Sequence, residues 1–170
     1  MTVRILLMAA AAPMVLSGAL AAEEKTRPLV VWPGYLLELP ADHCVRTQNG
    51  PDFHVLYVCD RRAPKTILAG VYCGFAPDFA PACKNPAKRT WTANGLSFKS
   101  VRGAEGCAEF LVQDPSDARR GSLDIWFGPE ARDHPNLAEA LIASVRPAQL
   151  PLGDVPDPPA CEEKPSASRK

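Results

Sequence analysis

The feature that most constrains this chain is its set of six cysteines, which all lie downstream of an apolar N-terminal run. They are Cys44, Cys59, Cys73, Cys83, Cys107 and Cys161. An even number of cysteines in an exported chain is typical of a disulfide framework, because the compartment outside the cytosol is oxidising. We therefore expect three disulfides, although the count alone cannot choose the pairing.

Local geometry favours pairing the cysteines in sequential order. This order predicts the bridges Cys44–Cys59, Cys73–Cys83 and Cys107–Cys161. The first bridge would join the two strands of a hairpin centred on the turn signal at 49–52. The second would close a short proline-rich loop, and the third would tie the C-terminal segment back to the domain.

The first residues predict export. Arg4 gives a short positive start, residues 5–16 are almost continuously apolar, and Ala19 and Ala21 occupy the small-residue positions that precede a signal-peptidase cleavage site. The apolar run is short for a span of about 30 Å of hydrocarbon. We therefore predict a signal peptide over 1–21 and a periplasmic or secreted protein, with no stable membrane insertion after cleavage.

Length and charge set the domain organisation and argue against one class of partner. After the leader the chain is long enough for one ordinary domain, so we predict a single exported α+β domain over 22–147. Residues 148–170 are rich in proline and charged residues, which predicts a polar tail. Basic and acidic residues number 19 each, so we expect no nucleic-acid partner. The pairs Arg61-Arg62 and Arg119-Arg120 are expected in solvated turns.

Neither a redox site nor a metal site fits the cysteines and histidines. The sequence has no Cys-x-x-Cys pair, the close spacing that lowers a thiol pKa and eases disulfide exchange. His43, His54 and His134 do not have the spacing of a structural zinc site. We therefore expect no metal and no cofactor.

Six segments are typical of β-strands because they combine β-branched and aromatic residues with alternating polarity. They are 35–39, 53–60, 66–73, 96–102, 107–113 and 122–127. Short connections rich in turn residues favour antiparallel pairing. In the fifth segment Ala108, Phe110 and Val112 share the face that should point to the core, and in the sixth Asp124 should face solvent. Trp126 is expected to be partly exposed on the outer face.

One amphipathic helix is predicted late in the chain. Leu137, Leu141 and Val145 recur at every fourth residue, Pro135 is tolerated in a first turn, and Pro147 ends the pattern. The apolar stripe of this helix must cover an apolar surface, for which the sheet is available. The expected fold class is therefore α+β: a small antiparallel sheet packed against one late amphipathic helix and stapled by disulfides.

The loop between Cys73 and Cys83 is the strongest candidate for a functional surface. A disulfide across it would stabilise the fold by about 3 kcal/mol, and its prolines restrict the backbone further. Rigid aromatic side chains are typical of protein interfaces, although the two phenylalanines could instead fold inward as a lid over the sheet. The partner-binding surface that we expect consists of Phe75, Phe79, Lys84, Lys88, Arg89 and Trp91.

The sequence contains no familiar catalytic motif: neither a nucleophile elbow, nor His-Glu-x-x-His, nor a phosphate-binding glycine loop. We therefore expect a non-enzymatic, disulfide-stapled protein-binding module, such as a periplasmic accessory, inhibitor or immunity-type protein. Its partner would be another exported or envelope protein. One alternative is a small-molecule or lipid carrier with its ligand between sheet and helix. The other is a hydrolase that uses His43 or His54, and in one version of it an unpaired Cys107 is the nucleophile.

Overall fold

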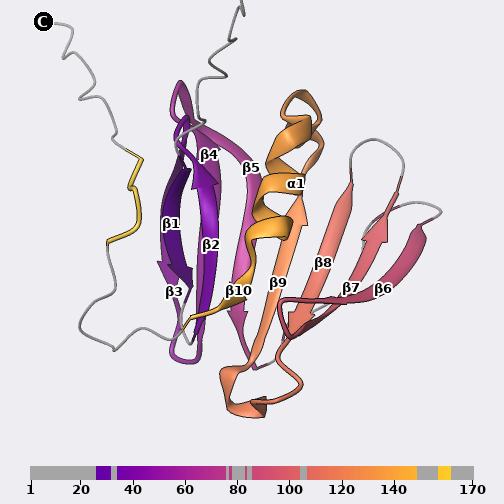
Figure 1. Ribbon diagram of the computed structural model, residues 1–170. Coiled ribbons are helices and arrows are strands. Elements are labelled where there is room, and N and C mark those ends of the chain that lie inside the picture. The colour runs from indigo at the N-terminus through magenta and orange to yellow at the C-terminus, as the bar shows by residue number, and fades with distance from the viewer. Residues whose placement is uncertain are drawn as a thin grey trace, which may run out of the picture.

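Antiparallel β-sheets make up most of the described structure. The computed structural model describes residues 26–31, 34–75, 77, 83, 86–103, 107–148 and 157–161. A large sheet has seven strands in the order β3-β4-β5-β9-β8-β7-β6, and a small sheet has three in the order β1-β2-β10 (Figure 1). Neighbouring strands within each sheet are antiparallel, as the short connections predict.

The bounds of the strands follow the chain order. They are β1 (Thr26–Val31), β2 (Tyr35–Pro40), β3 (His43–Asn49), β4 (Phe53–Asp60), β5 (Ala63–Gly74), β6 (Ala87–Ala93), β7 (Leu96–Arg102), β8 (Ala108–Gln113), β9 (Ser122–Phe127) and β10 (Arg146–Pro147). The described residues also form one α-helix and two 3-10 turns. These are α1 (Pro135–Ser144), η2 (Ala118–Arg120) and η3 (Pro129–Asp133).

The predicted α+β fold class is wrong, because the described structure is mostly β, with two sheets and a single short helix. The second layer is built mainly by the hairpin of β1 and β2. From Leu29 on, alternate described residues of this hairpin point inward and are fully buried. These residues are Leu29, Val31, Tyr35, Leu37 and Leu39. The ten residues of α1 add Leu137 and Leu141 to the same core. The prediction missed β1, and so assigned to the helix a surface that the hairpin largely covers.

The small sheet and α1 lie on the same side of the large sheet (Figure 1). Their apolar side chains share one core with the inner face of the large sheet, which contributes Val71, Ile125 and Phe110 among others. Figure 1 shows β8, β7 and β6 extending past α1 at one side of the molecule. The backbones of α1 and the small sheet therefore do not cross this end of the inner face.

Five of the six predicted strand segments lie within strands, the segment 107–113 exceeds β8 by Cys107 alone, and the helix lies where the apolar repeat predicts it. The inner face predicted for β8 is confirmed, since Phe110 and Val112 are buried in the core. Trp126 is half-buried, as expected. Asp124 is buried, so the prediction that it faces solvent is wrong. Strands β1, β3, β6 and β10 were not predicted.

The predicted disulfide pairing is also wrong. The structure pairs Cys44 with Cys161 and Cys83 with Cys107, and leaves Cys59 and Cys73 as buried thiols. Two disulfides therefore replace the expected three. Cys44 and Cys59 do face one another as Cα partners across β3 and β4, as the hairpin predicts, but Cys44 is bonded elsewhere. Cys73 packs in the core cluster, away from the bridge that Cys83 makes.

Part of the predicted C-terminal tail is attached to the edge of the large sheet. The Val45 amide donates to the Pro159 carbonyl at 2.9 Å, and the Cys161 amide donates to the Val45 carbonyl at 3.0 Å. Ala160 forms a parallel bridge with Val45. Residues 157–161 thus cover the free edge of β3, and the Cys44–Cys161 disulfide holds them there.

The described structure is compatible with export. Two disulfides fit an oxidising compartment. No helix in the described part of the chain is both long enough and apolar enough to cross a membrane. The predicted signal peptide, 1–21, lies outside the described residues.

Candidate binding site

A pocket of about 390 Å³ lies on the inner face of β6, β7 and β8, next to α1. We call it the basic pocket. Residues from three strands and the helix line it, and they include Lys88, Arg89, Trp91, Arg102, Phe110 and Ile142. The antiparallel register brings them together, because Arg89 pairs with Ser100, which in turn pairs with Phe110.

The floor of the basic pocket is aromatic. The ring of Trp91 stacks on Phe98 with centroids 5.0 Å apart and meets Phe110 edge to face at 6.4 Å. Phe110 also contacts Phe127 edge to face at 5.9 Å. Phe98 and Phe110 are buried, whereas Trp91 is half-buried and presents part of its indole to the pocket. The floor is therefore rigid and apolar, which favours binding without a large ordering cost.

The walls of the pocket are cationic. The Arg89 guanidinium lies 5.5 Å from the centroid of the Trp91 ring, and the Arg102 guanidinium lies 5.2 Å from that of Phe110. Lys88, Arg89 and Arg102 are all exposed, and none forms an ion pair with a described acidic residue. Guanidinium groups held over aromatic rings are arranged to receive a carboxylate or a phosphate.

The charge of this hairpin differs sharply from that of the whole chain. Residues 87–102, which form β6, β7 and their turn, contain Lys88, Arg89, Lys99 and Arg102 and no Asp or Glu. The full sequence carries equal numbers of basic and acidic residues, 19 of each. This hairpin therefore has a local net positive charge, which acidic residues elsewhere in the chain balance.

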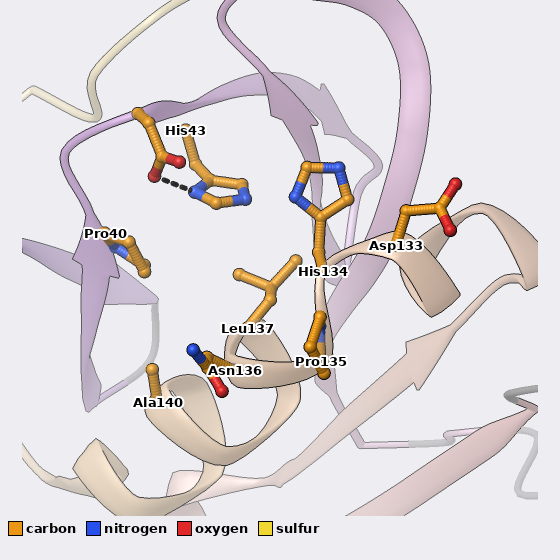
Figure 2. A pocket seen from close by; sticks show the side chains of 9 residues that line it. Pro40, His43, Asp133, His134, Pro135, Asn136, Leu137 and Ala140 are labelled. Carbon is orange, nitrogen blue, oxygen red and sulfur yellow. Dashed lines mark ion pairs between the residues drawn. The ribbon is translucent and has the colours of Figure 1, made fainter.

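A second pocket, of about 180 Å³, lies between the β2–β3 turn and the start of α1 (Figure 2). His43 is buried there, with its Nδ1 2.6 Å from Asp42 Oδ1. The His134 Nε2 is 3.9 Å from Asp60 Oδ2, and the two imidazole rings meet edge to face with centroids 5.5 Å apart. Figure 2 shows the rings turned toward one another across the pocket mouth.

Two carboxylates, Asp42 and Asp133, line this histidine pocket together with the two imidazoles. Its described lining contains no Ser, Thr, Cys or Lys that could act as a nucleophile. Cys107 is bonded to Cys83, which contradicts the version of the hydrolase alternative in which Cys107 is the nucleophile. His54 lies on β4, where burial lowers its pKa. Among the described residues, no group of three or more His, Cys, Asp or Glu side chains is placed to hold a metal ion.

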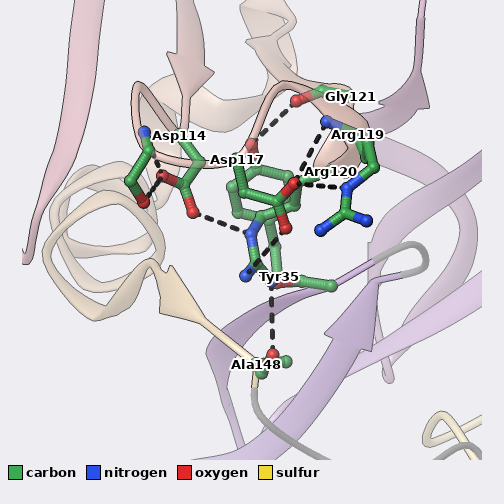
Figure 3. A network of polar contacts seen from close by, with 9 residues as sticks. Tyr35, Asp114, Asp117, Arg119, Arg120, Gly121 and Ala148 are labelled. Carbon is green, nitrogen blue, oxygen red and sulfur yellow. Dashed lines mark hydrogen bonds and ion pairs between the residues drawn. The ribbon is translucent and has the colours of Figure 1, made fainter.

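A third polar cluster surrounds Arg120 (Figure 3). The Arg120 Nε donates to Asp114 Oδ2 at 2.8 Å, and its Nη1 donates to the carbonyls of Gly34 at 2.6 Å and Ala148 at 3.2 Å. Tyr35 donates to the Gly121 carbonyl at 3.0 Å. The Arg120 Nε and Nη1 groups and the Tyr35 hydroxyl all donate within the protein, so these residues join the two sheets. Arg120 is therefore not in a solvated turn, as predicted, whereas Arg119 is.

The structure brings together only part of the predicted partner-binding surface. Lys88, Arg89 and Trp91 all line the basic pocket. Phe75 is 63% exposed, which argues against a buried lid. It directly follows Gly74, which pairs with Ser122 across β5 and β9. The residues paired at this level of the sheet lie at the opposite end of the strands from Arg102. Phe79 and Lys84 lie outside the described residues.

Arg102, Phe110 and Ile142 were missed as binding residues. The signal for Arg102 was present in the sequence, because Asn94-Gly95 is the strongest two-residue hairpin signal. Pairing outward from that turn places Ala87 opposite Arg102. Ile142 carries no comparable signal, since its position depends on how α1 packs on the sheet.

Comparison with known proteins adds no family to this description. No protein-family model matches the chain, and no curated protein or solved structure matches it significantly.

Proposed function

We propose that this chain is an exported, non-enzymatic binding protein that docks another exported or envelope protein through an acidic segment seated in the basic pocket. One observation carries the proposal: two arginines, Arg89 and Arg102, lie over an aromatic floor, on a hairpin whose residues 87–102 carry four cations and no acid. A carboxylate on Arg89 or Arg102 would form charge-assisted hydrogen bonds worth about 1.5–3 kcal/mol each. Arginine and tryptophan are also enriched among the residues that dominate binding energy.

The architecture supports binding more than catalysis. The guanidinium groups of Arg89 and Arg102 lie over aromatic rings. The described lining of the pocket contains no Asp, Glu or His that could exchange a proton with a substrate. General acid–base chemistry requires a titratable group within hydrogen-bonding reach of a substrate proton, and arginine stays protonated at physiological pH. The disulfides and aromatic contacts hold the pocket in one shape, which reduces the entropy lost on association.

Charge reversal tests this function. The variant Arg89→Glu/Arg102→Glu should lose the partner that the native protein captures from periplasmic extract, with recovery reduced at least about tenfold. The matched control is Arg62→Glu/Lys65→Glu, which makes the same change of net charge at exposed positions outside the pocket. Loss of the same partner with both variants, or with neither, contradicts docking at the basic pocket.

A small anionic ligand is the second candidate. The pocket volume lies at the lower end of the range for small-molecule sites, about 300–1,000 Å³, and Ile142 of α1 forms one wall, so the pocket does lie between sheet and helix. Native mass spectrometry of the purified protein separates the two candidates. A co-purified anion that Arg89→Glu/Arg102→Glu removes supports the carrier, whereas an unliganded mass favours the protein partner.

A further inference from the structure

The geometry points to strand addition at β6: the acidic segment of the partner pairs with the backbone of this edge strand, as an eighth strand of the large sheet. This inference rests on the proposed function and specifies how the partner is held. It starts from the sheet order, in which β3 and β6 are the two edge strands.

The two edges of the large sheet differ in the described structure. Residues 157–161 pair with β3 through the Val45 backbone and close that edge. No described segment pairs with β6 on the side away from β7. Its residues 87–90 are exposed, so their outer backbone groups are accessible. An open edge with unpaired amides and carbonyls is a template for another strand.

The turn fixes which backbone groups point outward. Asn94 and Gly95 have φ values of 52° and 76°, as a type I′ turn requires, so Ala93 and Leu96 form the hydrogen-bonded pair that closes the hairpin. Hydrogen-bonded and non-hydrogen-bonded pairs alternate along an antiparallel ladder. The amides and carbonyls of Thr92, Thr90 and Lys88 are therefore directed away from β7.

Side chains at this edge specify an acidic occupant. Arg89 and Arg102 lie on the pocket side of the sheet. Lys88 and Lys99 occupy alternate positions that belong to the opposite face, and Lys88 borders the pocket only at the edge strand. An added strand alternates its side chains between the two faces, so acidic residues on either face meet a cation. A second copy of this hairpin would instead bring four positive charges against four. Like charges disfavour that pairing, and lysine on an edge strand is a recognised protection against self-association.

The test uses the full protein and a fluorescein-labelled peptide of alternating glutamate and valine. Binding is measured by fluorescence anisotropy at about 0.15 M salt, where surface charges are screened beyond about 8 Å. The decisive variant is Thr90→Pro, because it removes one outward amide without removing a bond to β7, and proline is tolerated at such an edge position. Thr90→Ala is its control, and retained disulfides and circular dichroism verify folding.

We expect Thr90→Pro to weaken peptide binding about tenfold and Thr90→Ala to leave it within about twofold. A peptide N-methylated at alternate residues should lose binding to the same extent, and a lysine-for-glutamate peptide should not bind. If Arg89→Glu/Arg102→Glu abolishes binding while Thr90→Pro and N-methylation do not, strand addition is overturned and the acidic-binding function stands.

Two other outcomes also overturn strand addition by an acidic partner. One is the absence of any peptide binding to the native protein, which leaves the proposed function to be judged by its own capture experiment. The other is a dimer in analytical ultracentrifugation that Thr90→Pro dissociates, which would make a second copy of the chain the occupant.

Discussion

Cys59 and Cys73 are buried thiols in a chain whose other four cysteines form disulfides. Burial raises the pKa of the Cys73 thiol to about 12. Burial also raises the pKa of Cys59, and the nearby Arg46 opposes this shift. Because the thiolate is the reactive form, both groups are inert in the folded protein. The even number of cysteines predicted disulfides, but a count cannot show that the Cys73 side chain packs in the core.

We predict that the native protein takes up no thiol reagent, because both free thiols are buried. After denaturation without reduction, two cysteines per chain should react, and peptide mapping should place the label at Cys59 and Cys73. A reduced and denatured sample, in which all six react, is the control. Label at Cys107 would contradict the disulfide assignment, and so would a denatured sample with no reactive thiol.

Asp114 and Arg120 form a buried ion pair at the junction of the two sheets. Hydrogen bonds from Ser116, with a further contribution from Arg120, lower the pKa of Asp114 below its ordinary value of 3.8. A carboxyl group whose folded pKa is depressed stabilises the fold fully above its unfolded pKa. That contribution is lost as the pH falls through the folded value.

Asp114→Asn should therefore lower the free energy of unfolding by about 2 kcal/mol at pH 7, because the largely buried Arg120 loses the closer of its two carboxylate partners and keeps only Asp117, at 3.7 Å. The difference from the native protein should shrink as the pH falls from 3.8 through the lower folded pKa, where the native carboxyl group also becomes protonated. Urea unfolding at neutral and acidic pH measures both values. Asp117→Asn, at a more exposed position of the same cluster, is the control. A difference that does not change with pH would show that the ion pair is not its cause.

At the scale of elements, the sequence predicts a strand well where alternating apolar residues mark its buried face, and poorly where that alternation is missing. Strand β8 alternates core and outer residues, and its inner face was predicted correctly. Strand β6 lacks that signal, because six of its seven residues are polar, charged or alanine and its first four are exposed. Only its hairpin partner β7 reveals it. The basic pocket was therefore predictable in part, through Lys88, Arg89 and Trp91.

A substitution in the β6–β7 turn tests whether this turn stabilises the hairpin. Gly95→Ala should lower the free energy of unfolding by about 1 kcal/mol, because alanine is disfavoured at a φ of 76°. A Cβ at this position meets no neighbouring atom within 4 Å, so the cost is one of backbone conformation. Asn94→Gly, which suits the same turn, is the control and should change stability by less than about 0.5 kcal/mol. Equal stability of Gly95→Ala and the native protein in urea would contradict the type I′ assignment.

At the scale of the molecule, two layers close around one core that neither could bury alone. The prediction of one sheet and one helix failed because a hairpin at the start of the described chain, β1–β2, packs beside a helix near its end. Such long-range packing leaves no local pattern in the sequence. The same holds for the Cys44–Cys161 disulfide, which joins residues 117 positions apart.

The sequence separation of the paired cysteines predicts which of the two disulfides stabilises the fold more. Closing a loop removes conformational entropy from the unfolded chain, and the effect grows with loop length. Loops of 117 and 24 residues correspond to about 5 and about 3.5 kcal/mol on this model. Cys44→Ser/Cys161→Ser should therefore have a lower melting temperature than Cys83→Ser/Cys107→Ser.

Both cysteines must be replaced in each variant, because a lone Cys44 would still face the Cys59 thiol and could form the bridge that the hairpin first suggested. A lower melting temperature for Cys83→Ser/Cys107→Ser would contradict the ranking. It would mean that the shorter bridge holds native packing around β8, beyond its effect on the unfolded chain.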